Sequence, residues 1–345
     1  MCPFPQLDAA VLQTIRDGLF FIVGPHRSGT TLLQAMLSSH SGLTVPPETG
    51  YFDQVWPRRS ALGSLRSVAN LERFGRFVNG PDCGVSDLQL DWSQVNSAVA
   101  LGAAGYDDLF VAILACYARS RGKRRAGEKS PRHIFAVPEL SRLYPQAKFV
   151  CLIRDPRAVV HSERQTDWGS RSISRLTRRW CRVVDAAEKL VRSLPTDRFR
   201  VMRYEDLIAD PESQLRSVCD FLGEVFEPQM LRFPDRAAAE RGFRQDEIWK
   251  ENTLRAVDSG RNELWRGELS PAQIKLLEGL AGSRLLQWGY TPLQPPVSGW
   301  SCLRTWVADH WQWVCELVTG VVKGRRRRRP WSSVWREMWA THRIP

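Results

Sequence analysis

The sequence is poor in the patterns that build metal centres and disulfide frameworks. It has six histidines and eight cysteines, and no two cysteines form a CxxC pair. No group of histidines has the spacing of a zinc site, so we expect the protein to bind no metal. Cys116 and Cys151 lie in apolar segments, where a free cysteine behaves as a small hydrophobic residue. We prefer that interpretation to disulfide bonds.

Segments that direct a chain into or across a membrane are also missing. The first ten residues, MCPFPQLDAA, lack the basic region and the apolar core of a secretion signal. The longest clean apolar run, Leu109 to Ala118, is far shorter than the roughly 20 residues that span a bilayer. We therefore expect a cytoplasmic protein, with a reservation about its C-terminal segment.

Acidic residues are too few to balance the basic ones, and the formal net charge is +12. Residues 323–345 hold eight Lys or Arg against one Glu, so this short segment carries +7 and the rest of the chain only +5. A mildly basic body that binds a charged nucleotide explains this balance, and we expect no nucleic-acid partner. The 345 residues, 43% of them hydrophobic, suffice for one large α/β domain or two modest ones.

The most informative stretch begins with a short apolar run, Leu19 to Val23. Its length and composition indicate a buried strand of a parallel sheet, although periodicity alone does not exclude a helix. The loop GPHRSGTT follows at residues 24–31, and a helix can begin at Ser28 or Gly29. Such a loop presents backbone N–H groups at a helix N-terminus, which is an arrangement that binds an anion.

This loop has the glycine spacing of a Walker A motif but lacks its lysine, because Thr30 occupies that position. Arg27 is the cation inside the loop. The pattern favours a nucleotide with a different charged end over a triphosphate carried with magnesium. A nucleotide kinase or NTPase is the alternative activity, and an ordinary strand-turn-helix corner with two glycines is the alternative without a ligand.

Two further residues are candidates for the same site. Pro46 and Pro47 force an extended path that presents Glu48, a candidate general base whose alternative is a solvated loop carboxylate. The segment AGEKSP, residues 126–131, indicates a short strand that ends at Lys129. The alternative for Lys129 is an ordinary exposed lysine.

A second buried strand is predicted at Lys148 to Ile153, and Arg154 follows it directly. Ligands of parallel sheets bind beyond the carboxyl ends of the strands, so Arg154 is placed like the loop arginine and a two-phosphate site is plausible. Ser162, near the second turn of the next helix, can meet the same anion. Tyr204 ends a further predicted strand, where its ring could stack on a base.

Six motifs in order along residues 19–292 resemble the sulfotransferases that use 3′-phosphoadenylyl sulfate (PAPS), especially the branch with bacterial, carbohydrate and protein-tyrosine enzymes. The motifs are GPHRSGTTLL, VPPETGYF, EKSPRH, KFVCLIRDPRAVVHS, RYEDL and NELWRGELS. The resemblance implies an α/β fold like that of P-loop NTPases, in three layers with a central parallel sheet flanked by helices. It also implies PAPS as co-substrate, no metal, and transfer of a sulfuryl group to a hydroxyl of a carbohydrate, a glycolipid or a tyrosine.

The resemblance also implies roles for particular residues. Glu48 matches the catalytic base, Lys129 the lysine that steadies the transferring group, and Arg27 the cation beside it. The expected cofactor-binding residues are those of the 5′-phosphosulfate loop, the 3′-phosphate pair, an adenine contact and a closing segment. They are Arg27, Ser28, Gly29, Thr30 and Thr31; Arg154 and Ser162; Tyr204; and Arg266 and Gly267. The last two depart from the Arg-Lys-Gly pattern of the cytosolic enzymes.

The resemblance leaves a C-terminal segment unmatched, so we predict a sulfotransferase domain at 1–295 and a separate segment at 296–345. The segment holds seven of the 14 tryptophans and the run Arg325 to Arg329. One helical stripe is predicted at Leu303, Trp306, His310, Trp313, Leu317 and Val321, and another at Trp331, Trp335 and Trp339. Such helices suggest an anionic membrane surface, here the inner face of the membrane.

Two alternatives for this segment stay open, a helix that binds a partner and a poorly ordered basic tail. A third possible function follows from it, a membrane-associated binding protein on a P-loop scaffold. The acceptor cannot be chosen from the sequence among a sugar, a lipid-linked glycan and a tyrosine.

Overall fold

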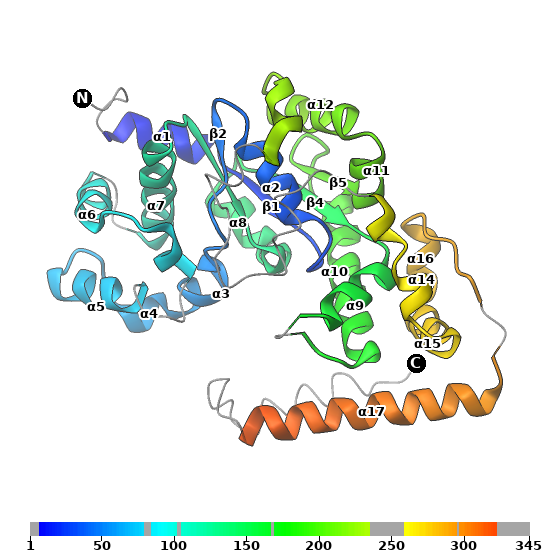
Figure 1. Ribbon diagram of the computed structural model, residues 1–345. Helices are drawn as coiled ribbons and strands as arrows, with labels where there is room; N and C mark the ends of the chain where they lie inside the picture. Colours follow the sequence, from blue (N-terminus) through cyan, green and yellow to red (C-terminus); the bar gives the residue numbers. More distant parts are fainter. Residues whose placement is uncertain are drawn as a thin grey trace. The chain divides into compact units, whose positions relative to one another are not determined.

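A computed structural model describes residues 7–78, 84–101, 105–166, 169–234, 259–294 and 297–322. The chain divides into two compact units that interleave in sequence (Figure 1). Residues 1–153 and 186–259 form the first unit, and residues 154–185 and 260–345 form the second. The predicted boundary after residue 295 stays a prediction.

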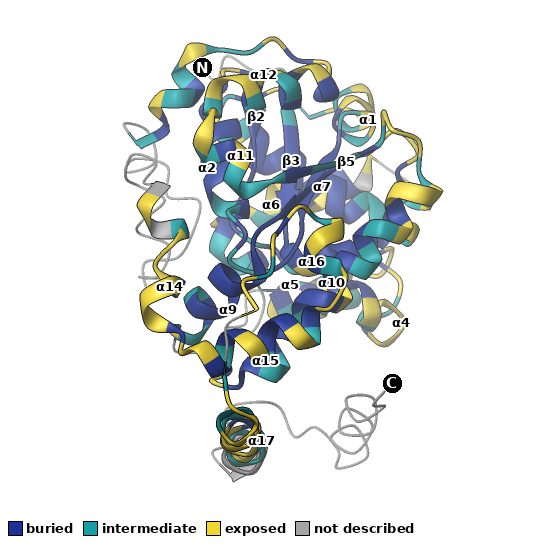
Figure 2. Cartoon of the chain, turned by 90° about the vertical axis from the view of Figure 1, so that its right-hand side faces the viewer, coloured by how far each residue is buried: buried dark blue, intermediate teal, exposed yellow. Residues whose placement is uncertain are grey.

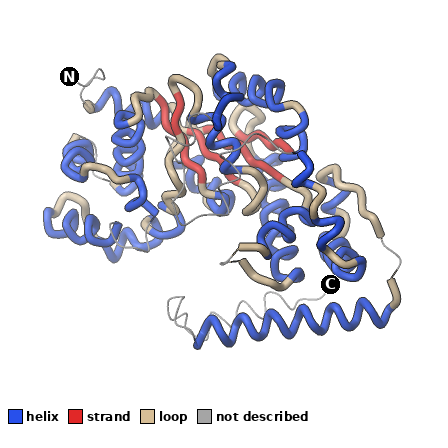
Figure 3. Tube along the Cα trace, viewed as in Figure 1, coloured by secondary structure: helices blue, strands red, loops and turns tan. Residues whose placement is uncertain are grey.

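The first unit is built on a five-stranded, all-parallel sheet, seen as the red strands of Figure 3. Its strands run in the order β2-β3-β1-β4-β5. They are β1 Phe20–Val23, β2 Leu43–Thr44, β3 Arg125–Lys129, β4 Lys148–Ile153 and β5 Phe199–Arg203. The short apolar runs at β1 and β4 are fully buried, as predicted for central strands with helices on both faces.

Successive side chains of a strand point to opposite faces, and both faces of this sheet are covered. On one face, Phe20 and Ile22 share a core with Leu33 of α2 (Thr30–Ser38) and with Leu215 of α12 (Pro211–Leu222). On the other face, the ring of Phe21 lies 6.1 Å from that of Phe110 in α7 (Tyr106–Ser120). Helix, sheet and helix therefore form three layers, and the predicted fold class is confirmed. In Figure 2 most of the sheet has the dark blue of buried residues, whereas three of the five residues of β5 are intermediate.

The remaining helices of the first unit connect these strands or cover them. They are α1 Ala9–Asp17, α3 Tyr51–Gln54, η1 Trp56–Arg58, α4 Arg59–Leu62, α5 Val68–Val78, η2 Gly84–Leu88, α6 Trp92–Ala100, η3 Pro131–Phe135, α8 Val137–Leu143, α11 Tyr204–Ala209 and η4 Pro228–Arg232.

One expectation about these elements is wrong. Tyr204 does not end β5 but is the first residue of α11.

The second unit is helical. Its helices are α9 Pro156–Arg164, α14 Trp265–Glu268, α15 Pro271–Ala281, α16 Arg284–Gln287 and α17 Gly299–Val322. Two further elements contain a boundary between the units: α10 Ile173–Ser193 continues from the second unit into the first, and η6 Ser259–Asn262 continues from the first into the second. Its core joins Val160, Leu176, Trp265 and Leu277.

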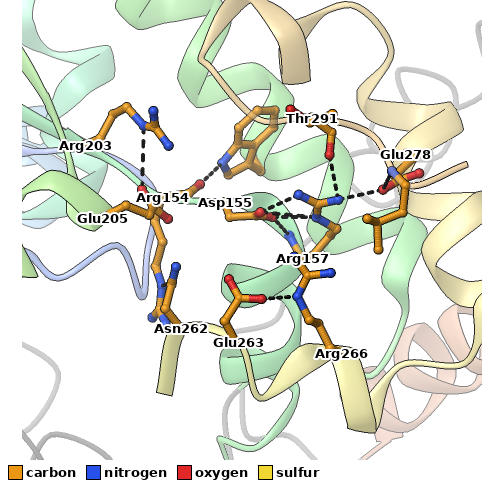
Figure 4. A network of polar contacts seen from close by, with 12 residues as sticks. Arg154, Asp155, Arg157, Arg203, Glu205, Asn262, Glu263, Arg266, Glu278 and Thr291 are labelled. Atoms are coloured by element: carbon orange, nitrogen blue, oxygen red, sulfur yellow. Dashed lines mark hydrogen bonds and ion pairs between the residues drawn. The ribbon is translucent and has the colours of Figure 1, made fainter. Parts of the chain in front are cut away.

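A buried arginine ties three segments of this unit together (Figure 4). Arg157 donates from Nη2 to Asp155 at 2.6 Å, and from Nη1 to Glu278 at 2.7 Å and to the Thr291 carbonyl at 3.1 Å. Its guanidinium also lies 4.4 Å from the Trp265 ring centroid. Because all these groups satisfy one another, this arginine is a structural residue of the second unit.

The described part of the chain also bears on the cysteines and on membrane spans. Cys116 and Cys151 are buried free thiols, so the interpretation as small hydrophobic residues is confirmed for both. Burial raises the pKa of the Cys116 thiol to about 12, which makes it unreactive. Among the helices described, none combines the length and the apolar character that crossing a membrane requires.

Candidate functional site

The loop between β1 and α2 has an unusual backbone. Gly24, Arg27 and Gly29 all have positive φ, of 141°, 63° and 84°. A Cβ on Gly24 would stand 2.1 Å from the carbonyl oxygen of Leu152, so only glycine lets the loop pass β4. Arg27 adopts the left-handed conformation without being glycine, which costs about 1–2 kcal/mol. Strain of this kind persists where the surrounding structure enforces it and is common at functional sites.

The loop is shaped to hold an anion. Gly29 caps α2 without any side-chain hydrogen bond. The Ser28 side chain is fully buried, and its Oγ has no hydrogen-bond partner among the described residues. A buried hydroxyl without a partner and an uncapped helix N-terminus both fit a phosphate or phosphosulfate group. Thr30 and Thr31 follow as the first two residues of the helix.

Lys129 and Glu48 meet beside this loop. Lys129 lies at the carboxyl end of β3, and the register pairs it with Ile22 of β1, two residues before the loop begins. Its Nζ is 2.5 Å from Glu48 Oε1. The lysine side chain is fully buried, whereas the glutamate side chain is 34% exposed. Lys129 is therefore not the exposed lysine of the alternative interpretation, and Glu48 is a partly exposed carboxylate that is paired with this lysine.

The segment that carries Glu48 is anchored at both ends. Buried Gln34 of α2 donates from Nε2 to the carbonyl oxygens of Val45, at 3.1 Å, and Pro46, at 2.8 Å. Gly84 packs against the other end so closely that a Cβ there would lie 2.2 Å from the Glu48 carbonyl oxygen. The segment that carries Glu48 is thus bonded to α2, the helix that directly follows the phosphate loop.

A second charged pair lies buried next to the first. Glu128, which precedes Lys129 in β3, is 0% exposed and accepts hydrogen bonds from Thr49 Oγ1 at 2.9 Å and Ser130 Oγ at 2.5 Å. His133 Nδ1 is 2.8 Å from Glu128 Oε2. Burial alone would lower the pKa of His133, but the charge and hydrogen bond of Glu128, together with the charges of Asp53 and Glu48, outweigh burial and raise that pKa. Burial opposes ionisation of Glu128 too, but His133 and the hydroxyl donors lower its pKa.

Sequence reasoning missed Glu128, His133, Thr49 and Gln34. Glu128 and Lys129 stand side by side in a predicted strand of a parallel sheet, and both faces of such sheets are usually covered, so burial of adjacent strand residues on opposite faces was a usable signal. No sequence signal connects Thr49 or Gln34 to them, because both contacts depend on how the loop folds back on the sheet.

Tyr204 lies against the phosphate loop within the first unit. A Cβ on Gly29 would stand 2.3 Å from Cδ2 of the tyrosine ring, so the ring packs directly on the loop backbone. The side chain is half-buried and also contacts the core beneath α2. The predicted contact of this ring with an adenine base stays a prediction.

The two residues predicted to hold a second phosphate belong to the second unit. Arg154 follows β4 directly in the chain, and its side chain is largely buried. Its Nε donates to Asn262 Oδ1 at 3.1 Å, and its carbonyl accepts from Trp180 Nε1 at 3.0 Å (Figure 4). Ser162 lies in the second turn of α9 and is half-buried. Their shared role stays a prediction.

Arg266 and Gly267 both lie in the short helix α14 of the second unit. Arg266 is half-exposed, is paired with Glu263, and lies over the ring of buried Trp265. Among the residues that the structure describes, no group of three or more His, Cys, Asp or Glu could hold a metal ion.

Comparisons with known proteins identify relatives of this chain. The model of the family described as "Sulfotransferase family" matches residues 20–228. Nodulation protein NoeE of Sinorhizobium fredii is 28% identical over 302 residues, which cover 78% of this chain and 65% of that protein. The protein-tyrosine sulfotransferase of Drosophila melanogaster is 25% identical over 301 residues, which cover 85% and 55%. In both, the match spans less than two thirds of the relative's length.

A solved structure gives a matching fold. The sulfotransferase domain from the olefin synthase of Synechococcus PCC 7002 superimposes with a TM-score of 0.52 at 26% sequence identity. The match covers 76% of this chain and 94% of that domain. The sulfotransferase domain from the curacin biosynthetic pathway has the same TM-score at 22% identity and supports the fold alone.

Proposed function

The chain belongs to the sulfotransferase family, and from this premise we propose that it transfers a sulfuryl group from PAPS to the hydroxyl of an acceptor. The same membership favours sulfuryl transfer over the alternative of a nucleotide kinase or NTPase. The missing Walker lysine supports this choice, since Thr30 stands in its place. No metal takes part in the proposed reaction.

The observation that carries the proposal is the pair formed by Glu48 and Lys129. Their side chains meet at 2.5 Å, and strand register places Lys129 next to the strand that enters the phosphate loop. A base candidate, a buried cation and an anion-binding loop thus stand at one edge of one sheet. Ligands of parallel sheets bind at this edge.

Each residue has a distinct role in the proposed reaction. Bound PAPS would supply the sulfuryl group, whose bond to the phosphate oxygen breaks as a bond to the acceptor oxygen forms. Glu48 takes the proton of the acceptor hydroxyl. Arg27, Lys129 and the N–H groups at the start of α2 stabilise the negative charge that develops on the phosphate side.

The remaining contacts hold the nucleotide. The loop residues Ser28, Gly29, Thr30 and Thr31 bind the 5′-phosphosulfate, and the buried Ser28 hydroxyl, which has no partner in the described part of the chain, supports this assignment. For the 3′-phosphate we assign Arg154 and Ser162, for adenine Tyr204, and for the closing segment Arg266 and Gly267. These assignments come from the matching motifs.

The acceptor is a hydroxyl-bearing molecule, either a tyrosine, a sugar or a lipid-linked glycan. Several relatives are named protein-tyrosine sulfotransferases, which makes tyrosine peptides a natural first acceptor to test. Transfer from ³⁵S-labelled PAPS is measured into tyrosine peptides, oligosaccharides and glycolipids fractionated from cell extracts. Label in a hydroxyl-bearing product supports the proposal, and phosphoryl transfer from ATP with Mg²⁺ in its place would refute it.

We also infer a peripheral membrane association at the inner face of the membrane, because α17 turns an apolar side to solvent. Its Asp309 accepts from the backbone N–H of Ile173 at 2.5 Å, and Glu316 accepts from Ser170 Oγ at 2.6 Å. Trp313 is buried. These contacts fix the acidic side of α17 to the start of α10 within the second unit.

The opposite side of α17 carries four exposed apolar residues at helical spacing: Trp300, Leu303, Val307 and Trp311, between 50% and 76% exposed. The predicted stripe is corrected here, since it combined exposed Leu303 and Trp306 with buried Trp313. The second predicted stripe, at residues 331–339, lies outside the described residues. Exposed tryptophans followed by a segment of charge +7 favour an anionic lipid surface, where each basic residue adds about 1 kcal/mol.

Co-sedimentation with vesicles tests this association on the full chain. We expect binding to vesicles with 30% phosphatidylserine, weak binding to pure phosphatidylcholine, and loss of binding in the double variant Trp300→Ser, Trp311→Ser. The control is Leu286→Ser, which changes an equally exposed apolar residue of α16 in the same unit. Undiminished binding of the double variant would contradict a role for this side of α17.

A further inference from the structure

The buried carboxylate of Glu128 needs an explanation that the proposed reaction does not supply. It is fully buried in β3, and its contacts are with residues outside the phosphate loop. Burying a carboxylate costs several kcal/mol before its partners compensate, and an apolar side chain of similar size avoids that cost. Its partners are three: Thr49, Ser130 and His133.

The contacts of β3 with the Glu48 segment form a double pairing. Lys129 pairs with Glu48, and the preceding Glu128 pairs with the following Thr49. Two consecutive residues of the strand therefore bind two consecutive residues of the Glu48 segment. Because neighbouring side chains of a strand point to opposite sides, the two contacts hold the loop from opposite sides of β3. A one-residue shift of the loop would break both contacts at once.

The Thr49 hydroxyl has a second task in the loop. While it donates to Glu128 Oε1 at 2.9 Å, it accepts the backbone N–H of Tyr51 at 3.1 Å, at the start of α3. This hydroxyl therefore joins the buried carboxylate to the turn directly after Glu48. Glu48 itself is 34% exposed, so burial alone does not fix its position.

We propose that Glu128 is a positioning residue: paired with His133, it holds the Thr49 hydroxyl and thereby keeps the Glu48 carboxylate against Lys129. His133 keeps Glu128 from swinging away, because its ring is fixed edge-on against Phe52 at 5.5 Å. Ser130 holds the same carboxylate oxygen from the strand side. The role in catalysis rests on the proposed function, whereas the geometric role does not. Catalytic groups need placement within about 0.5 Å, and supporting residues of this kind supply it.

The test uses Thr49→Val, which keeps the shape of the side chain and removes only the hydroxyl. Acetylation of Lys129 by acetic anhydride is followed in the free protein by mass spectrometry, with exposed Lys275 as the internal reference. We expect Lys129 to be protected in the wild type and to react about tenfold faster in Thr49→Val, equivalent to about 1.4 kcal/mol. Thr49→Ser restores the hydroxyl and should restore protection.

A matched control separates this effect from the general loss of a buried hydroxyl. Thr177 of α10 is also 0% exposed, and its hydroxyl bonds the Ile173 carbonyl at 2.8 Å. Thr177→Val should leave the reactivity of Lys129 unchanged. Cooperative urea unfolding of each variant verifies that the labelled protein is folded.

The activity assay gives a second readout. With the proposed transfer reaction, Thr49→Val should lower kcat about tenfold and leave KM for PAPS unchanged, and Thr49→Ser should recover kcat. If Lys129 is acetylated as slowly in folded Thr49→Val as in the wild type, the positioning role is wrong. Because labelling is read on the free protein, it decides that role whether or not sulfate transfer is found.

Discussion

Replacement of Glu48 by glutamine separates the catalytic role of this residue from its structural one. Glutamine retains an acceptor oxygen in the place of Oε1, so Lys129 keeps a hydrogen bond but loses the negative charge that faces it at 2.5 Å. The bond from the ammonium group is still a hydrogen bond to a charged group, worth about 1.5–3 kcal/mol, because only the acceptor loses its charge. Glu48 is 34% exposed, which lets water compensate in part. We therefore expect Glu48→Gln to lower the free energy of unfolding by only about 1 kcal/mol.

The effect on turnover should be far larger. An amide cannot accept the proton of the acceptor hydroxyl, and loss of a general base typically costs 10²- to 10⁴-fold. Affinity for 3′-phosphoadenosine 5′-phosphate should change little, because the phosphate loop and α2 are untouched. Labelled transfer gives kcat, calorimetry gives the affinity, and urea unfolding gives the stability.

A similar carboxylate in the first unit serves as the control. Glu227 is 26% exposed and accepts from Ser41 Oγ at 2.5 Å and from Ser41 N at 2.7 Å. Glu227→Gln should lose similar stability and keep full kcat. If folded Glu48→Gln that binds nucleotide normally transfers sulfate at the wild-type rate, the assignment of Glu48 as the base is wrong.

Two further predictions concern the loop cation and the buried pair. Arg27→Ala and Arg27→Gly should both lower kcat roughly 10²- to 10³-fold. The free energy of unfolding in urea should be about 1 kcal/mol higher for the glycine variant, because the φ of 63° strains alanine and not glycine. Equal stability of the two variants would refute a strained loop. His133 faces Glu128, Asp53 and Glu48, and its pKa is raised in the folded protein. The contribution of His133 to stability is therefore full below about pH 6.5 and is lost as the pH rises through the raised pKa. The pKa of Glu128 is lowered, so the contribution of Glu128 is lost only as the solution becomes acidic. Relative to the double variant Glu128→Gln, His133→Gln, wild-type stability should therefore be greatest between about pH 4.5 and 6.5 and decline above it, as measured by urea unfolding, and a difference that rises above pH 6.5 would contradict the pairing.

The sheet and its loop could be predicted because they depend on local sequence. The apolar runs of β1 and β4 are too short for typical helices, and the glycines at 24 and 29 stand where the backbone needs positive φ. The order of the strands brings Lys129 beside the loop, so a strand ending in lysine was an informative signal. The contact of Lys129 with Glu48 shows that the two side chains meet, and their catalytic roles stay a prediction.

Other features depend on tertiary contacts that no local pattern records. The burial of Glu128 arises from Thr49, Ser130 and His133 gathering around it, and Thr49 lies 79 residues away in the sequence. Likewise, helical spacing predicts which residues of α17 share a side but not which side faces solvent. Asp309 and Glu316 decide that, because they bind the start of α10.

The choice between a phosphosulfate nucleotide and a triphosphate is the central claim, and calorimetry without an acceptor tests it most directly. The protein is titrated with 3′-phosphoadenosine 5′-phosphate in the absence of metal and with ATP in the presence of Mg²⁺. We predict tight binding of the first, weakened by Arg27→Ala, and weak binding of the second. Preference for ATP with Mg²⁺ would contradict the account.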